Sequence, residues 1–446
     1  MKFGGTSVDG AARLAAAARV VVSRRTERPV VVTSAMAGVT NALEALLSLS
    51  RRADRAGVDA RLEELRARHL AVAAELAPGD AALAARLEER LRDLRVLLRG
   101  VRLVGALTPA ASDAVLGHGE LLAQELFAAA MAAADGPAEV VDARRVVATD
   151  GRHGAAVADQ TETAARAATL VAPLAEAGVV PILAGYVGGG PDGAPTTLGR
   201  GGSDLSASII GLALGARRIE IWTDVDGILS ADPRVVPAAR LLERATFREA
   251  AELAGFGAKV LHPASIDPAV EGGIEVVVRN SLRPERPGTV IGPSGQGDGG
   301  ARAVASRSGL ELLALRAPGA MRDATFGAEA FRRLGDEGLA PLAVAVGPLG
   351  FEFLLPEGEA AGRAARAIAA WGRVDRLPKL ALVALVGEGL AAAPELWRAA
   401  LDACGPIRPL RIAQGPRGAS LLFVARDEDA APLTRLLHAA LLEGRP

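Results

Sequence analysis

The chain has 446 residues and a mass of 45.5 kDa, which is too long for one ordinary domain. Lys and Arg (51) nearly balance Asp and Glu (52), so no overall basic field would attract nucleic acid or an acidic membrane. A single cysteine, Cys404, excludes an internal disulfide and a cysteine-rich metal site, and no apolar run approaches the ~18 residues that cross a bilayer. We therefore expect a soluble cytoplasmic protein without a secretory signal segment, and we assign no metal-ligating residues.

The use of lysine is unusually sparse. Only Lys2, Lys259 and Lys379 are lysines, whereas the other basic residues are arginines. In an arginine-rich chain, a remaining lysine either survives by chance or marks a place where a compact ammonium is needed and a planar guanidinium would not serve. Lys2 and Lys259 both stand in glycine-rich segments, which makes them candidates for contact with an anion.

The region up to residue 291 alternates short β-branched runs with helical stretches. Strands are predicted at Pro29–Ser34, Ala138–Asp142, Val179–Gly185, Arg218–Thr223 and Ile274–Arg279. Most are followed by Gly, Ser or Asp and then by a helical segment, a pattern typical of a largely parallel, doubly wound α/β sheet. Such sheets bind ligands at the carboxyl ends of their strands.

Residues from Asn41 to about Val104 have a different composition, rich in Ala, Leu, Glu and Arg with helical spacing. Two apolar stripes are visible: Leu62, Leu65, His69 and Val72 on one, and Leu83, Leu87, Leu91 and Leu94 on the other. They predict a helical hairpin inserted in the α/β domain, with the charged residues on solvated faces. We expect His69 to be packed rather than catalytic.

A linker is predicted at residues 292–308, which contain PSGQGDGG and no apolar periodicity. Beyond it, residues 309–446 repeat a strand, helix, strand, strand, helix, strand order, which predicts two α+β βαββαβ units in tandem. The predicted elements are Leu310–Arg316, Phe326–Glu337, Leu342–Val346, Phe351–Leu355, Ala360–Trp371, Lys379–Val386, Leu396–Cys404, Pro409–Gln414, Ala419–Ala425 and Ala430–Leu442. Small domains of this kind commonly bind regulators or pair with a second copy.

Three short segments in the first half have residues suited to polar ligands. In KFGGTS (2–7), adjacent glycines would let backbone N–H groups approach an anion, with Lys2 as a point charge; a plain tight turn explains the segment equally well. In TSAMAGVTN (33–41), small hydroxyls suit a small polar ligand or a helix N-cap. In GHGE (117–120), Glu120 either compensates the helix dipole or accepts a hydrogen bond from a substrate ammonium.

Three further segments follow. TLGRGGSD (197–204) is the strongest, because Arg200 offers a fork for a carboxylate, Gly201 to Ser203 form an N–H nest, and Asp204 can orient a lysine or a metal; the alternative is a capped helix. IWTDVDGIL (221–229), continuing to DPR (232–234), suits either a nucleotide or an ordinary acidic turn. GFGAKVLHP (255–263) places Lys259 on a glycine-flanked turn, and we expect His262 to be structural.

Taken together in this order and spacing, the six segments resemble aspartate kinase (aspartokinase) of the amino-acid kinase family over nearly all of residues 1–291. The helical insert at about 41–104 and the C-terminal units are similar to the monofunctional lysine-sensitive subtype with its paired ACT domains. The resemblance implies a carbamate kinase-like α/β catalytic domain at 1–291, a linker at 292–308 and tandem ACT-like regulatory domains at 309–446.

The resemblance also implies an activity, namely transfer of the ATP γ-phosphate to the side-chain carboxylate of L-aspartate with Mg²⁺, the first step of lysine, threonine and methionine biosynthesis. It implies catalytic roles for Lys2 and Asp204. It implies aspartate binding by Ser34, Ala35, Thr40, Glu120 (amino group), Arg200 (α-carboxylate), Gly201, Gly202 and Ser203. It implies ATP binding by Lys2, Phe3, Gly4, Gly5, Thr223, Asp224, Leu229, Arg234, Lys259 and Val260. It further implies an amino-acid effector at the ACT domains and a homodimer or larger homo-oligomer.

This chain departs from the family pattern in three places. Lys2 follows Met1 directly, so we expect the first strand to be missing or incomplete. Leu229 replaces the tyrosine of the lysine-sensitive subtype, and LAVAV (342–346) stands where that subtype carries its effector-contacting strand, which weakens the case for inhibition by lysine. The alternatives are another amino-acid or carbamate kinase, or a catalytically weak amino-acid sensor.

Overall fold

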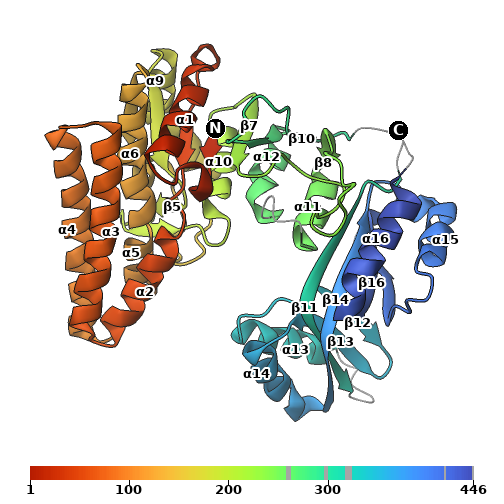
Figure 1. Cartoon of the computed structure of the whole chain (residues 1–446). Coiled ribbons are helices and arrows are strands. Elements are labelled where there is room, and N and C mark those ends of the chain that lie inside the picture. Colours follow the sequence, from red (N-terminus) through yellow and green to blue (C-terminus); the bar gives the residue numbers. More distant parts are fainter. Residues whose placement is uncertain (258–262, 296–299, 317–323, 416–417, 444–446) are drawn as a thin grey trace. The chain divides into compact units, whose positions relative to one another are not determined.

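The computed structural model describes residues 1–257, 263–295, 300–316, 324–415 and 418–443 (Figure 1). It consists of two compact units. The first unit comprises Met1–Ile228, Glu243–Phe247 and Val260–Gly295, and the second comprises Leu229–Leu242, Arg248–Lys259 and Gln296–Pro446. Of the helices that the structure describes, none combines the length and the apolar character needed to span a membrane.

An eight-stranded sheet forms the centre of the first unit, in the order β3-β4-β2-β1-β7-β9-β10-β8. The strands are β1 (Lys2–Phe3), β2 (Val31–Thr33), β3 (Ala138–Val141), β4 (Val180–Ala184), β7 (Arg218–Thr223), β8 (Arg244–Thr246), β9 (Glu275–Asn280) and β10 (Thr289–Gly292). Neighbouring strands are parallel except for the antiparallel pair β9 and β10. The predicted doubly wound, largely parallel sheet is confirmed.

The first strand is short, but it is present. Lys2 pairs with Val32 on one side and Ile221 on the other, so β1 joins β2 to β7 in the middle of the sheet. Phe3 stacks on Trp222 and contacts Phe127, with ring centroids 5.9 and 5.3 Å apart. Of the two expectations, a missing or an incomplete first strand, the first is wrong: β1 is two residues long and lies between β2 and β7.

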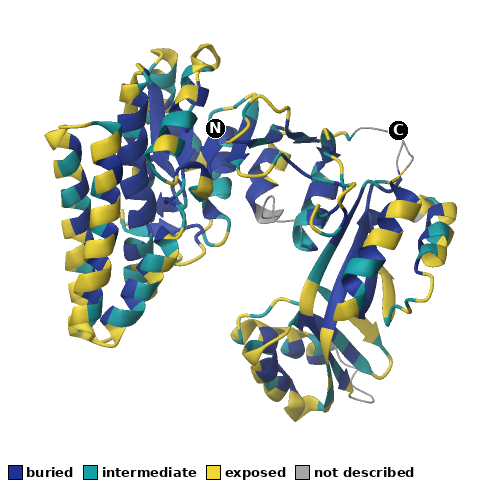
Figure 2. Cartoon of the chain, viewed as in Figure 1, coloured by how far each residue is buried: buried dark blue, intermediate teal, exposed yellow. Residues whose placement is uncertain are grey.

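Side chains of β1 alternate between the two faces of the sheet, and this places the flanking helices. Phe3 contacts Phe127 of α6 (His118–Ala133), whereas the Lys2 side chain reaches Asp204 of α10 (Gly202–Ala213). The helices α6 and α10 therefore cover opposite faces. Burial is concentrated in the strands and in α6 (Figure 2). The remaining helices and strands of this unit are α1 (Ala11–Val22), α7 (Ala143–Val146), α8 (Gln160–Leu170), α9 (Ala172–Glu176), α12 (Asp267–Glu271) and the hairpin β5 (Val187–Gly189) and β6 (Pro195–Thr197).

The helical insert stands beside α6 and consists of α2 (Val39–Arg51), α3 (Arg55–Leu76), α4 (Ala81–Val104) and α5 (Pro109–Leu116) (Figure 1). Both predicted stripes of the hairpin are buried, as their periodicity required. Asp54 and Asp80 cap α3 and α4 by accepting backbone N–H bonds. His69 is buried, its Nδ1 lies 2.7 Å from the Leu65 carbonyl, and burial lowers its pKa to about 4. It packs, as expected.

The second unit contains a six-stranded antiparallel sheet in the order β12-β13-β11-β14-β16-β15. Its strands are β11 (Ala303–Arg316), β12 (Ala343–Gly347), β13 (Gly350–Pro356), β14 (Arg373–Val386), β15 (Arg411–Gln414) and β16 (Ser420–Arg426). Its helices are α13 (Ala324–Asp336), α14 (Glu359–Ile368), α15 (Pro394–Ala403), α16 (Ala430–Leu441) and most of α11 (Phe247–Gly255). The two predicted α+β modules are present, and they share this one sheet.

The two modules are interleaved rather than strictly consecutive. The first part of β11, from Ala303 to Arg307, pairs with Leu382–Val386, whereas Leu310 to Arg316 pair with the first part of β14. One module is therefore inserted into the other. The first strand of the outer module, Ala303–Arg307, precedes the inserted module in the sequence. Since β11 begins at Ala303, it corrects the predicted linker at 292–308: Ala303, Val304 and Ala305 are buried small residues that complete a sheet.

Candidate functional site

A pocket of about 420 Å³ opens at the carboxyl ends of the central strands of the first unit. It lies where β1, β2 and β4 end, as the parallel sheet predicts. Nine predicted site residues line it: Lys2, Ser34, Thr40, Glu120, Arg200, Gly201, Gly202, Ser203 and Asp204. Residues from four of the predicted sequence segments are thus brought into one cavity.

The Lys2 ammonium is held by a carboxylate on the opposite helix. Lys2 Nζ lies 2.6 Å from Asp204 Oδ1, and Lys2 is only 8% exposed. Asp204 is in the first turn of α10, which begins directly after Gly201 in the left-handed conformation (φ +73°). Because one partner comes from a strand and the other from a helix, the charge is fixed in direction and faces the pocket. This geometry gives Asp204 the orienting contact that its predicted role requires.

Glu120 supplies the opposite charge in the same pocket. It is 4% exposed, and burial raises its pKa to about 7, although the Ala35 backbone N–H, the Lys2 ammonium and the Ser203 hydroxyl all favour its ionised form. Among the described residues, Glu120 Oε2 has no hydrogen-bond partner. A buried carboxylate with one unused oxygen favours a ligand that donates hydrogen bonds or carries positive charge.

The loops around the pocket are pressed together at glycines. A Cβ at Gly5 would lie 2.8 Å from the Ala35 carbonyl oxygen, and one at Gly202 would lie 2.5 Å from a ring carbon of Tyr186. A larger residue at either position would force the loops apart. Ala35 does not line the pocket but donates its N–H to Glu120, so it acts on the site through that carboxylate.

Two of the predicted phosphate-binding residues have their groups already engaged. The Gly4 N–H donates to the Trp222 carbonyl at 3.0 Å, and the Phe3 side chain is wholly buried in the core. The N–H of Gly4, one of the two adjacent glycines expected to approach an anion, is therefore not available to a phosphate. Lys2 is the part of this segment that faces the pocket.

The residues predicted to bind nucleotide at the end of β7 lie beside the first loop. The Ser281 hydroxyl lies 2.7 Å from the Ser7 hydroxyl and donates to the Thr223 carbonyl at 3.0 Å, which ties the two segments together. Thr223 Oγ1 donates to the exposed Asp224 carboxylate at 3.2 Å. Thr223 and Asp224 are therefore held at the same edge of the sheet as Lys2.

The other predicted nucleotide residues lie elsewhere in the chain. Leu229 and Arg234 belong to the second unit, where Leu229 bridges to Leu241 and the exposed Arg234 forms a two-pronged pair with Asp232, with Nη2 at 2.6 Å. Lys259 and Val260 lie outside the described residues.

Four residues that line the pocket were absent from the sequence-based assignment: Glu44, Gly154, Tyr186 and Gly199. Glu44 lies one helical turn after Thr40, so helical spacing alone would have placed it on the same face. Tyr186, the one tyrosine of the chain, has a positive φ of 67°, which is uncommon for a bulky residue and marks functional sites. Gly154 is brought in by tertiary contacts and carries no local signal.

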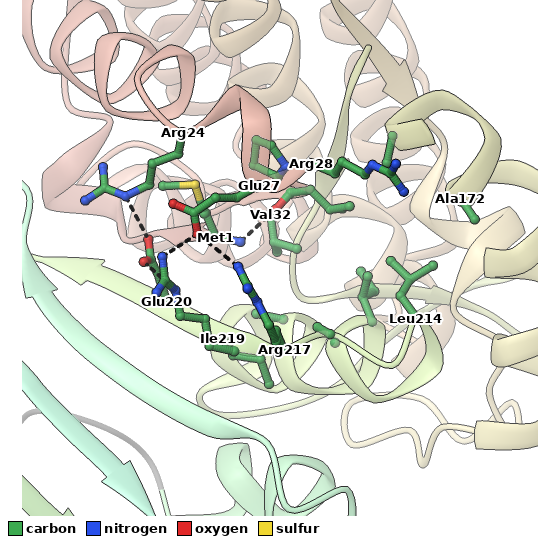
Figure 3. Close-up of a pocket in the computed structure, with 18 of the residues that line it drawn as sticks. Met1, Arg24, Glu27, Arg28, Val32, Ala172, Leu214, Arg217, Ile219 and Glu220 are labelled. Carbon is green, nitrogen blue, oxygen red and sulfur yellow. Dashed lines mark hydrogen bonds and ion pairs between the residues drawn. The ribbon is translucent and has the colours of Figure 1, made fainter. Parts of the chain in front are cut away.

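A second pocket and the acidic residues of the chain were further candidates for a functional site. A second pocket of about 270 Å³ lies at the amino ends of β1 and β7, near Met1 and Arg218, and its wall includes the ion pair of Arg24 with Glu220 (Figure 3). It contains none of the predicted site residues. Across the described part of the chain, no three His, Cys, Asp or Glu residues are grouped so as to hold a metal ion.

Lys2, Arg200 and the carboxylates of Glu120 and Asp204 thus lie at the carboxyl edge of the parallel sheet, and positive charge in such a pocket is what a phosphoryl-transfer enzyme requires. The model of the amino acid kinase family matches residues 1–280, more than half of the chain. Two relatives cover it almost completely. It is 34% identical over 453 residues to lysine-sensitive aspartokinase 3 of Escherichia coli (strain K12), covering 99% of this chain and 98% of that one. It is 34% identical over 467 residues to the chloroplastic aspartokinase 2 of Arabidopsis thaliana, covering 100% and 84%.

Solved structures agree with the relatives. The crystal structure of E. coli aspartokinase III in complex with aspartate and ADP matches with a TM-score of 0.85 at 33% identity, covering 99% of both chains. The same enzyme in complex with lysine and aspartate also gives 0.85. The chain therefore belongs to the amino acid kinase family and, within it, to the aspartokinases. The family assignment and the fold made from the six sequence segments are confirmed.

Proposed function

We propose that this chain is an aspartate kinase, which transfers the γ-phosphoryl group of ATP to the side-chain carboxylate of L-aspartate and releases ADP and 4-phospho-L-aspartate in the cytoplasm. The observation that carries the proposal is similarity over the whole chain to relatives named aspartokinases, one of them solved with aspartate and ADP. The alignment with the E. coli relative covers 99% of this chain and 98% of that one, so the similarity is not confined to the kinase region.

The chemistry of the site supports this reaction. A carboxylate acceptor has an ordinary pKa of about 4 and is ionised at neutral pH, so it needs no general base. The difficulty is to bring an anion up to a polyanion, which requires positioning and positive charge. Lys2 would supply that charge to the transferring phosphoryl group, with Asp204 holding its ammonium 2.6 Å away.

Aspartate would be held at both ends of its backbone. Arg200 is exposed in the pocket and offers two parallel N–H donors to the α-carboxylate. Glu120, with its unused oxygen, would accept hydrogen bonds from the α-ammonium. The side-chain carboxylate would then point toward Lys2, because recognition of both α-substituents leaves it as the free end of the substrate.

Mg²⁺ would accompany ATP in this proposal. The chain offers no cluster of ligating side chains in its described residues, so we propose that the ion is held mainly by the nucleotide phosphates. The exposed Asp224 carboxylate at the end of β7 has the oxygen chemistry that Mg²⁺ prefers. When bound, the ion would screen the phosphate charge from the incoming carboxylate.

We also propose that the second unit binds an amino-acid effector and joins copies of the chain into a homo-oligomer. The E. coli relative was solved with lysine, which makes lysine the first effector to examine. In the second unit of this chain, β12 is an edge strand that pairs on one side only among the described residues, and it exposes Val344 and Val346, at 38% and 57%. Apolar edges of this kind favour pairing with another strand.

A substrate panel separates this proposal from its alternatives. ADP release is measured with Mg-ATP and, in turn, L-aspartate, L-glutamate, N-acetyl-L-glutamate and carbamate. We expect release with aspartate at least about a hundredfold above the others, because recognition of two α-substituents and one side-chain length excludes each of them. Preference for another acceptor would identify a different kinase, and binding of amino acids without ADP release would identify a sensor.

The raised pKa of Glu120 predicts a pH dependence for substrate binding. The α-ammonium binds the ionised carboxylate, which is lost as pH falls through about 7. The KM for aspartate should therefore rise about tenfold between pH 8 and pH 6, whereas the KM for ATP should change little. Initial rates measured across this range test the prediction. A KM for aspartate that is constant from pH 6 to 8 would contradict the assignment of Glu120 to the ammonium.

A further inference from the structure

A buried carboxylate outside the pocket joins three segments that surround it. Asp113, on α5, is 2% exposed. It accepts hydrogen bonds from Thr197 Oγ1 at 2.6 Å, from the Thr197 backbone N–H at 3.1 Å and from the Gly154 N–H at 2.9 Å. His153 Nδ1 lies 2.9 Å from the same carboxylate. One side chain thus connects α5, the loop around Gly154 and the strand β6.

Two of these partners, Gly154 and Thr197, connect Asp113 to the wall of the pocket. Gly154 itself lines it. Thr197 ends β6 three residues before Arg200, and its side chain is hydrogen-bonded to Tyr186, whose ring forms another part of the wall. A Cβ at Gly199 would lie 3.2 Å from the Gly154 carbonyl oxygen, so the loop that carries Arg200 rests on the loop that Asp113 holds.

The hydrogen bonds to the Asp113 carboxylate are stronger than those between the neutral groups of an ordinary turn. In the described part of the chain, the Asp113 carboxylate lies beside His153 Nδ1, and its other contacts are N–H and O–H donors. Hydrogen bonds to a carboxylate are about twice as strong as those between neutral groups, and a buried carboxylate is costly unless they are all made. The backbone at Gly154 and Thr197 is therefore fixed relative to α5.

We propose that Asp113 is a positioning residue for the aspartate site: through Thr197 and Gly154 it sets the place of the loop 198–204, and with it the guanidinium of Arg200. Asp113 touches no reacting atom. This inference rests on the proposed function, because it assigns the positioned loop to recognition of the substrate α-carboxylate. That group is remote from the transferring phosphoryl group, so a loosened loop weakens aspartate binding more than turnover.

The isosteric variant Asp113→Asn tests the proposal. It keeps the shape but replaces one acceptor oxygen by an NH₂ group, which donates and cannot accept the hydrogen bonds that Gly154 and Thr197 give to that oxygen. We expect the KM for aspartate, and its Kd by calorimetry, to rise about tenfold, with kcat and the KM for ATP within about twofold of the unchanged protein. Equal losses in kcat and both KM values, or no change, would overturn the proposal.

Asp150→Asn is the matched control. Asp150 lies in the same loop, and its carboxylate accepts from the backbone N–H groups of Arg152 and Val157, yet none of its hydrogen bonds in the structure reaches β6. Because Asp150 is exposed, this variant should lower the melting temperature less than Asp113→Asn does, and it should leave the KM for aspartate unchanged. If both variants raise this KM equally, general loosening of the loop explains the effect and Asp113 has no special role.

A second pair of variants decides the matter if Asp113→Asn fails to fold. Thr197→Val removes the hydroxyl that donates to Asp113 and should raise the KM for aspartate, whereas Thr197→Ser keeps it and should restore the KM to within about twofold. Equal KM values for the two would overturn the proposal. Failure of the proposed function is distinguishable, since the unchanged protein would then neither bind aspartate nor release ADP with it.

Discussion

Lys2→Arg is expected to lower kcat at least about a hundredfold while the protein stays folded. Removing a donor aimed at developing charge in a closed site typically costs this much. Lys2 Nζ lies 2.6 Å from Asp204 Oδ1 and Lys2 is 8% exposed, so the larger planar guanidinium cannot occupy the position of the compact ammonium without moving its surroundings. ADP release at saturating aspartate and Mg-ATP measures kcat, and circular dichroism reports the fold.

Lys379→Arg is the matched control for this variant, since it makes the same chemical change at another of the three lysines. Lys379 is exposed on β14 in the second unit, where an arginine can extend into solvent. It should leave kcat within about twofold. Near-normal turnover of Lys2→Arg would remove Lys2 from the transition state, and loss of the folded signal would assign it a structural role instead.

Glu120→Gln is expected to raise the KM for aspartate about a hundredfold. The amide has no charge and would present an N–H group toward the ammonium if its oxygen kept the contact with Ala35. Loss of a charged hydrogen bond in a buried site has an effect of this size. The pH dependence of this KM between 6 and 8 should also disappear, because the titrating group is gone.

The control for Glu120→Gln is Glu125→Gln on the same helix, α6. Glu125 is similarly buried, but it pairs with Arg86 and Arg90 of the insert, away from the pocket. This variant should lower the melting temperature and leave the KM for aspartate unchanged. By contrast, Glu120→Gln should not lower the melting temperature, since burial already disfavours the charge that it removes. An unchanged KM in Glu120→Gln would place the ammonium elsewhere.

The sequence predicted several strands and helices well because their hydrophobic pattern repeats, but it found only the second halves of the two longest strands, β11 and β14. Residues 218–223 were predicted as a strand and form β7 with the same bounds, and the buried stripes of α3 and α4 follow their leucine spacing. The strands β8 and β10 were missed, since three or four residues show too little alternation to be recognised. The interleaving of the two modules was missed because strand pairing across more than 70 residues leaves no local trace.

For the candidate site too, the sequence indicated some features and not others. Lys2, Glu120 and Arg200 stand in compact segments whose residue types suggested their chemistry, and the structure brings them into one pocket. The engaged N–H of Gly4 and the hold of Asp113 on Thr197 could not be read from sequence, because each depends on a backbone or side chain more than 80 residues away.

The central claim is that this pocket joins the ATP γ-phosphoryl group to the side chain of aspartate, and trapping the product tests it most directly. An acyl phosphate reacts with hydroxylamine to give a stable hydroxamate. With the unchanged protein, Mg-ATP, L-aspartate and hydroxylamine, we expect aspartyl hydroxamate and ADP to accumulate in equal amounts, and neither to form when Lys2 is replaced by alanine. ADP formed without hydroxamate, or at the same rate without aspartate, would contradict the account.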